Sequence, residues 1–148
     1  MNLTVAVAVA LLVLGALAVR AFLDYQHRQL FKPVRAVAPL SPNPGDYGVN
    51  YESVRFGTDN GLHGWHLPLD DQASTLLFCH GNRGNLSDRV ASCLLYRGMG
   101  FNVFALDYRG YGLSAGHPNE LGLYEDAFSA WRYLTETRGV APDNIALV

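Results

Sequence analysis

The sequence has no marked excess of charge of either sign. Its 148 residues include 11 Lys and Arg and 13 Asp and Glu, for a formal net charge of −2 at pH 7. Nucleic-acid-binding domains usually concentrate positive charge on one surface. The balance therefore gives no reason to expect nucleic acid as a partner.

Cysteine is scarce as well. Cys79 lies in an apolar segment of strand character and Cys93 on the apolar side of a helical pattern, and there are no others. Two cysteines placed in this way do not form a disulfide framework. We expect two buried, reduced thiols.

The sequence also lacks the usual signatures of phosphate and metal sites. No Walker or dinucleotide glycine pattern follows a predicted strand. His63 and His66 are three residues apart on a predicted strand, where their side chains point to opposite faces and cannot share an ion. We therefore expect no cofactor and no metal.

A long hydrophobic run is present at the amino terminus. Leu3 to Val19 contains no charged residue, and Arg20 follows it. About 20 mostly apolar residues cross a bilayer as a helix, so residues 1–23 are predicted to be a transmembrane anchor that contacts the membrane through residues 3–23. The alternative is a cleaved signal peptide, because Ala16-Leu17-Ala18 fits a cleavage site, although no Lys or Arg precedes the run.

The segment after the run is basic and then rich in proline. Under the positive-inside rule, its basic residues place the rest of a single-pass protein in the cytoplasm, whereas cleavage of the run would make the domain an exported one. These residues are Arg20, Arg28, Lys32 and Arg35. Four prolines from Pro33 to Pro44 predict a stiff, extended linker over residues 24–50. A globular domain is expected over residues 51–148.

The pattern of that domain is α/β. Residues 51–56 alternate in polarity, Asp59-Asn60-Gly61 is typical of a turn, and residues 62–67 return as a second strand, which together predict an antiparallel hairpin at a sheet edge. Three continuous apolar runs, at residues 75–79, 103–106 and 145–148, are typical of parallel strands covered on both faces. Helical spacing separates these runs, and Asn85 and Asn119 are the expected caps of the two helices.

Two loops follow predicted parallel strands, where ligands bind in open α/β sheets. The first is His80-Gly81-Asn82-Arg83-Gly84-Asn85, and the second runs from Asp107 through Arg109-Gly110-Tyr111-Gly112 to Ser114. Together they resemble the α/β hydrolases of the membrane-associated, serine-aminopeptidase-like branch, in which an H-G-N or H-G-G loop follows the third strand and a D-x-R-G-x-G-x-S loop the fourth. The resemblance extends from about Tyr51 to Val148.

The resemblance implies a role for particular residues. His80-Gly81-Asn82 would be the oxyanion loop, and the backbone N–H of Asn82 would be one donor to the developing oxyanion. His80, Asp107 and Arg109 would brace the loops. The implied reaction is serine-dependent hydrolysis of an ester, thioester or amide of a small-molecule or lipid-like acyl substrate.

A second serine motif needs separate treatment. Gly112-Leu113-Ser114-Ala115-Gly116 fits the G-x-S-x-G pattern of a nucleophile elbow. An elbow needs a strand directly before the first glycine and a helix directly after the second. Arg109-Gly110-Tyr111 and His117-Pro118 interrupt both junctions, so we do not expect Ser114 to be the nucleophile.

The chain is therefore expected to be the amino-terminal half of an α/β-hydrolase fold. It holds the oxyanion loop but not the nucleophile elbow, acid or base of that family, and we expect these residues to be inactive alone. The alternative is a short membrane-tethered, non-enzymatic binding module that uses the same loops. Nothing in the sequence indicates the oligomeric state.

Overall fold

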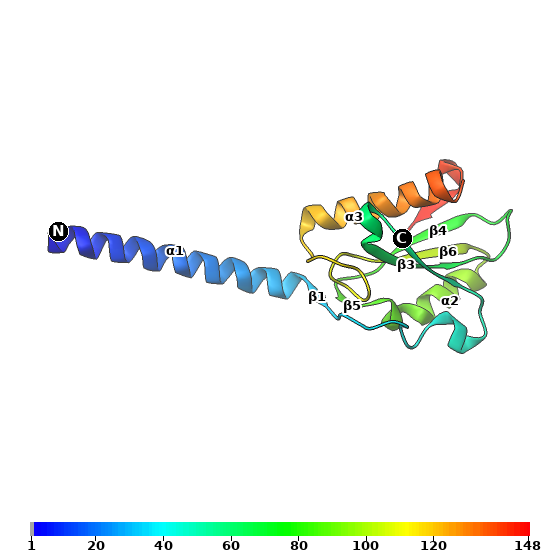
Figure 1. The fold of residues 1–148 in the computed structure, drawn as a ribbon, viewed down its shortest axis with the longest axis horizontal. Coiled ribbons are helices and arrows are strands. Elements are labelled where there is room, and N and C mark those ends of the chain that lie inside the picture. The colour runs from blue at the N-terminus through cyan, green and yellow to red at the C-terminus, as the bar shows by residue number, and fades with distance from the viewer. Residues whose placement is uncertain (1) are drawn as a thin grey trace. The chain divides into compact units, whose positions relative to one another are not determined.

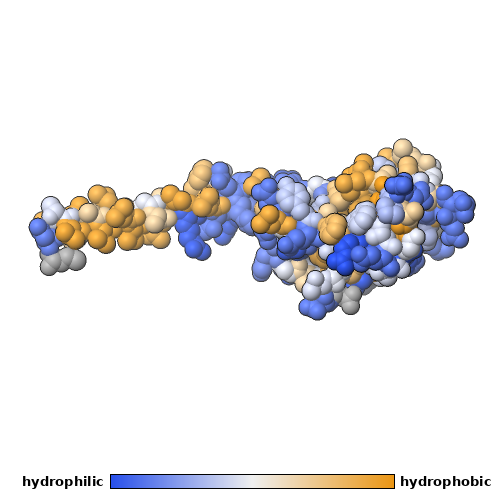
Figure 2. All heavy atoms as spheres, turned by 90° about the horizontal axis from the view of Figure 1, so that it is seen from above, coloured by the Kyte–Doolittle hydropathy of each residue, from blue (hydrophilic) through white to orange (hydrophobic). Residues whose placement is uncertain are grey.

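The computed structural model describes residues 2–148, apart from the side chain of Asn60. The chain divides into two compact units, residues 1–32 and 33–148. The first unit is the helix α1 (Leu3–Leu30), whose backbone is helical well beyond the apolar run. It is long and apolar enough to cross a membrane, by length and composition. In Figure 2 most of its amino-terminal part is covered by hydrophobic residues and its carboxyl-terminal part mainly by polar ones.

The second unit is built on a five-stranded sheet of order β2-β3-β6-β4-β7. The strands are β2 (Glu52–Phe56), β3 (Leu62–Leu67), β4 (Thr75–Cys79), β6 (Asn102–Asp107) and β7 (Ile145–Leu147). The strands β2, β3 and β6 are antiparallel neighbours, whereas β4 is parallel to both β6 and β7. The predicted antiparallel entry and parallel core are confirmed.

Helices cover both faces of this sheet (Figure 1). On one face lie a 3₁₀ turn (Leu86–Arg89) and α2 (Val90–Gly98), and on the other lies α3 (Glu120–Arg132), which ends in a π-helical turn (Tyr133–Thr137). Successive residues of β6 contribute to two hydrophobic cores, one on each face of the sheet. Val103 and Ala105 pack on the α2 side, and Phe104 and Leu106 pack on the α3 side. Burial of apolar side chains on both faces is the reason that the parallel strands read as continuous apolar runs.

Both predicted helix caps are present. The Asn85 side chain accepts a hydrogen bond from the Ser87 N–H at 2.8 Å, and the Asp88 carboxylate accepts one from the Asn85 N–H at 3.0 Å. The Asn119 side chain accepts from the Gly122 N–H at 2.9 Å. These bonds satisfy amides that a helix start leaves without internal partners. Of the two cysteines, Cys93 is buried and Cys79 is partly buried, and both are free.

Residues 33–50 lie within the second unit, whereas the sequence places the start of the globular domain near Tyr51. Leu40 is buried in the core on the α2 side, and a 3₁₀ turn (Pro44–Tyr47) capped by Asn43 follows it. The short strands β1 (Lys32–Pro33) and β5 (Arg83–Gly84) pair nearby. The proline-rich segment is therefore part of the domain, and apolar side chains such as Leu40 attach it to the core. A further turn (Thr58–Asn60) joins β2 to β3, and another (Pro142–Asn144) precedes β7.

Candidate active site

The two glycine-rich loops lie against each other at the carboxyl ends of β4 and β6. The His80 ring packs edge-on against Tyr108 and Tyr111, with ring centroids 5.4 and 5.3 Å apart. The Tyr111 hydroxyl donates a hydrogen bond to the Asn82 carbonyl oxygen at 3.0 Å. The parallel register of β4 and β6 brings both loops to the same edge of the sheet. Two motifs that are separate in the sequence thus form one site.

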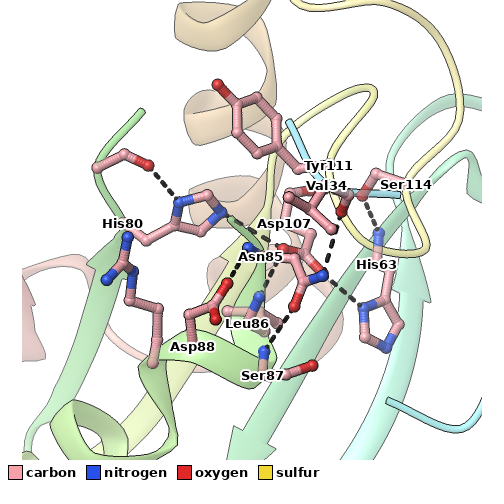
Figure 3. Close-up of polar contacts among 12 residues, drawn as sticks. Val34, His63, His80, Asn85, Leu86, Ser87, Asp88, Asp107, Tyr111 and Ser114 are labelled. Carbon is pink, nitrogen blue, oxygen red and sulfur yellow. Dashed lines mark hydrogen bonds and ion pairs between the residues drawn. The ribbon is translucent and has the colours of Figure 1, made fainter. Parts of the chain in front are cut away.

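Asp107 is the polar centre of this site (Figure 3). It is the last residue of β6 and is fully buried. Its Oδ1 accepts from the Leu86 N–H at 3.0 Å and lies 3.4 Å from His80 Nε2, while its Oδ2 lies 3.4 Å from His63 Nδ1. One carboxylate therefore joins β3, β6 and the segment that follows β4.

The charge of Asp107 is held by these neighbours. Burial alone would raise the pKa of its carboxyl group, but the nearby His63 and His80 imidazoles outweigh burial and lower the pKa. Ser53 Oγ lies 2.9 Å from the other ring nitrogen of His63, Nε2, and His80 Nδ1 donates to the Gly81 carbonyl oxygen at 2.6 Å. Both rings are thus oriented from their far sides.

The loop after β6 passes so close to Asp107 that only glycine fits at one position. Gly112 has φ of +48°, and a Cβ there would lie 2.0 Å from Asp107 Oδ2. Positive φ and close approach are the two conditions that select glycine. Gly112 therefore allows the backbone to pack directly against a buried carboxylate.

Arg109 braces the same loop from the α3 side. Its guanidinium donates to the Asp126 carboxylate at 2.7 Å and to Glu125 at 2.8 Å, and its backbone N–H donates to Asp126 at 2.7 Å. Asp126 is buried, and a carboxylate in that position is normally paired, as it is here. This pairing could not be predicted from the sequence, because the fold of the loop brings together two residues 17 positions apart.

Ser114 is buried and held from both sides. Its hydroxyl donates to the Asp107 carbonyl oxygen and accepts from the His63 N–H at 2.9 Å. No strand or helix adjoins the motif in the way that an elbow needs, since the chain is irregular from Tyr108 to Asn119. The structure therefore places Ser114 in a fixing role, in keeping with the expectation from its flanking residues.

Asn82 lies in the exposed loop between β4 and β5. Its carbonyl group is fixed by Tyr111, and the role of its N–H stays a prediction. A hollow of about 610 Å³ on the described surface lies away from Asn82, between the loop after β6 and α3, and is lined by residues that include Arg109, His117 and Phe128. The predicted oxyanion loop and this hollow are different places.

Sequence reasoning missed two contributors to the site. The first is His63, which is buried on β3 and lies 3.4 Å from the Asp107 carboxylate. The second is the segment from Val34 to Ala36, whose backbone contacts both loops. A backbone contact depends little on side-chain identity, so the sequence carried no signal for it.

Comparisons with known proteins agree with this architecture. The chain is 46% identical over 77 residues to the alpha/beta hydrolase domain-containing protein 17C of Mus musculus, covering 49% of this chain and 23% of that protein. It is 34% identical over 146 residues to the uncharacterized protein Rv2307c of Mycobacterium tuberculosis, covering 93% of this chain and 50% of that one. No family model matches the chain.

The solved structures point the same way. The Pyrococcus furiosus esterase Pf2001 superposes with a TM-score of 0.58 at 25% identity, covering 80% of this chain and 46% of the esterase. An alpha-beta hydrolase from Vibrio vulnificus shares the fold, with a TM-score of 0.57 at 23% identity and coverage of 83% and 45%. The chain belongs to the α/β hydrolase superfamily. It spans half or less of the length of the curated relatives compared above.

Proposed function

We propose that residues 33–148 supply the amino-terminal part of a serine hydrolase that cleaves an ester, thioester or amide. The observation that carries the proposal is the joining of the His80–Asn85 and Asp107–Ser114 loops at the carboxyl edge of the parallel strands. The chain belongs to the α/β hydrolase superfamily, and an esterase is among the solved structures that it resembles. Both findings support the same chemistry. The substrate would be a small-molecule or lipid-like acyl compound.

In this proposal the Asn82 N–H stabilises negative charge during acyl transfer. A serine from a segment beyond these residues attacks the carbonyl carbon, and a histidine takes the serine proton. The carbonyl oxygen becomes an oxyanion and accepts from the Asn82 N–H. One such donor contributes about 2.7–4 kcal/mol of transition-state stabilisation. Asp107 and Tyr111 hold the loop that presents this donor.

The test uses two substitutions at Asn82 in the longest open reading frame that contains this chain. Asn82→Pro removes the backbone N–H, and Asn82→Ala retains it. We expect Asn82→Pro to lower kcat on a short-chain nitrophenyl ester by about 10²–10³, with little change for Asn82→Ala. Equal effects of the two substitutions would contradict the assignment of the Asn82 N–H.

We propose further that residues 1–148 do not turn over substrate alone, because one oxyanion donor without a triad leaves little catalysis. The assay is hydrolysis of the same nitrophenyl ester by the isolated chain. Turnover above the rate without protein would refute the proposal, since it would place a working nucleophile within these residues, and its loss in Ser114→Ala would identify that nucleophile as Ser114.

The same protein is proposed to be a single-pass membrane protein with its domain in the cytoplasm. The apolar helix α1 and the basic residues after the apolar run support this topology. Amino-terminal sequencing of the mature chain tests it, because signal cleavage would remove the apolar run and export the domain.

A further inference from the structure

The segment Val34–Ala36, called the strap below, runs between the two loops of the candidate site. It belongs to the compact unit that starts at Pro33. The Val34 N–H donates to the Gly84 carbonyl oxygen at 3.2 Å, which ties the strap to the loop after β4. The Ala36 N–H donates to the Gly112 carbonyl oxygen at 2.9 Å, which ties it to the loop after β6.

One atom of the strap joins both loops at once. The Val34 carbonyl oxygen accepts from the Gly112 N–H at 3.0 Å and from Asn85 Nδ2 at 3.1 Å. A carbonyl oxygen has two lone pairs, and here each is used by a different loop. Figure 3 shows Val34 and Asn85 beside the Asp107 cluster. The Arg35 guanidinium adds a contact to the Gly116 carbonyl oxygen.

The loop positions that meet the strap are restricted in the residue types that they accept. Gly84 and Gly112 both have positive φ, at +82° and +48°. Asn85 is buried, and its oxygen is already used by the Ser87 N–H, so its amide nitrogen is the group left to reach Val34. Glycine has the most backbone freedom of any residue, so Gly84 and Gly112 depend on contacts such as those with the strap to stay in one conformation.

We propose that the strap is a positioning element that holds the oxyanion loop, residues 80–84, against the loop after β6. The proposal rests on the proposed function for its catalytic meaning, whereas its structural content stands on the hydrogen bonds above. The strap begins four residues after α1 ends at Leu30. Only three residues of chain therefore separate the end of α1 from the strap.

The decisive variant is Asn85→Asp. Aspartate keeps the oxygen that accepts from the Ser87 N–H and so keeps the helix cap. It removes the Nδ2 donor to the Val34 carbonyl oxygen. The matched control is Asn119→Asp, because Asn119 caps α3 through the same kind of bond to the Gly122 N–H, in a part of the chain that does not contact the strap.

The measurement is residue-resolved hydrogen exchange of the full chain in detergent micelles. In the unsubstituted protein we expect slow exchange of the Val34, Ala36 and Gly112 amides. Asn85→Asp should accelerate exchange at Val34, Gly112 and residues 80–84 by about fivefold or more, as expected for loss of one hydrogen bond. Core amides such as Val103 should be unchanged, which separates loosening of the loop from general destabilisation.

Two results would overturn the proposal. One is fast exchange at Val34, Ala36 and Gly112 in the unsubstituted chain. This result would overturn the proposal even if the variant fails to fold. The other is an Asn85→Asp pattern equal to that of Asn119→Asp. In the longer reading frame, Asn85→Asp should lower kcat with KM unchanged. Absence of any hydrolysis by that protein would count against the proposed function and leave the exchange result standing.

Discussion

The Ser114 hydroxyl is committed to two hydrogen bonds within the fold. It donates its proton to the Asp107 carbonyl oxygen, accepts from the His63 N–H, and is 2% exposed. A nucleophile needs an accessible oxygen and a base placed to take its proton. In the described residues no imidazole nitrogen fills that place, because both His63 nitrogens face Ser53 and Asp107.

Ser114→Ala is therefore expected to change stability and leave chemistry untouched. The substitution strands the buried His63 N–H, which costs about 1–3 kcal/mol. Urea unfolding followed by the fluorescence of Trp65, which is buried, measures this loss. In parallel, a fluorophosphonate probe should not label Ser114. Stoichiometric labelling of this residue in the folded chain would contradict the prediction.

At the scale of elements, α3 is joined to the loop after β6 by the Arg109–Asp126 pair. The carboxylate accepts from both the guanidinium and the backbone N–H of Arg109, and the Arg109 side chain crosses Gly122, where a Cβ would lie 2.6 Å from it. Helix and loop are therefore held by a charged, nearly buried contact. Apolar packing of Ala130 and Leu134 holds the rest of the helix side.

Asp126→Asn is expected to destabilise the domain by about 2 kcal/mol. Breaking a fully buried pair costs about 3–5 kcal/mol, and the value here is smaller because the Arg109 side chain keeps 27% of its exposure. The matched control is Glu136→Gln, which breaks the exposed Arg132–Glu136 pair on the following π-helical turn and should have no measurable effect. Equal urea midpoints for the two variants would contradict the prediction.

The hairpin β2–β3 is tied to the segment after α3 by a pH-sensitive contact. His66 lies 3.4 Å from Glu52 and 2.8 Å from the Arg138 guanidinium. Burial and the Arg138 charge lower the pKa of His66, and Glu52 opposes them in part. The unfolded chain, with a pKa of about 6.5, then binds a proton before the folded chain does. Stability is therefore lost as pH falls through 6.5 toward the folded pKa.

His66→Gln should remove this dependence, because glutamine cannot take up a proton and can still accept from Arg138. The expected difference is a shallower fall in unfolding free energy between pH 7.5 and 5.5, by at most about 1.4 kcal/mol per pH unit. The pKa of Glu52 is lowered, chiefly by Arg138, so its contribution is lost at more acidic pH and is separable. Identical pH profiles for the two proteins would exclude His66 as the source.

The elements that could be predicted are those whose signal lies in side chains near in sequence. The apolar runs gave β4, β6 and β7, and Asn85 and Asn119 gave the helix starts. The strap could not be predicted, because Val34 contributes through its backbone to residues 50 and 78 positions away. The Arg109–Asp126 pair could not be predicted for a related reason, since Arg109 is brought to Asp126 by the fold of a loop.

At the scale of the whole molecule, the alternative to a hydrolase is a membrane-tethered binding module. The amount of exposed apolar surface distinguishes the two. Apolar side chains are exposed on α3, at Leu121, Tyr124 and Phe128, and at the sheet edge, where Leu147 is 70% exposed. A self-sufficient binding module should unfold cooperatively and bind no hydrophobic dye. Dye binding by residues 33–148, tested without the apolar helix α1, would favour the partial hydrolase, because such surfaces are normally covered.

The last expectation concerns α1 and the membrane. The helix has 28 residues, and the mean hydropathy of its most apolar stretch of 18 residues is 2.5. At 1.5 Å per residue it is about 42 Å long, whereas the hydrocarbon core is about 30 Å thick. The apolar part can therefore cross the bilayer while Arg20, Asp24 and Arg28 reach the headgroup region.

We expect the full chain to remain in the membrane pellet after alkaline carbonate extraction. Leu11→Arg places a charge in the middle of the apolar run, at a cost of about 2.5–3.5 kcal/mol, and should release a large fraction of the protein. Leu23→Arg is the matched control, because an arginine near the end of the run can extend to the interface. Equal release of the two variants, or release of the unsubstituted chain, would show that α1 does not span the bilayer.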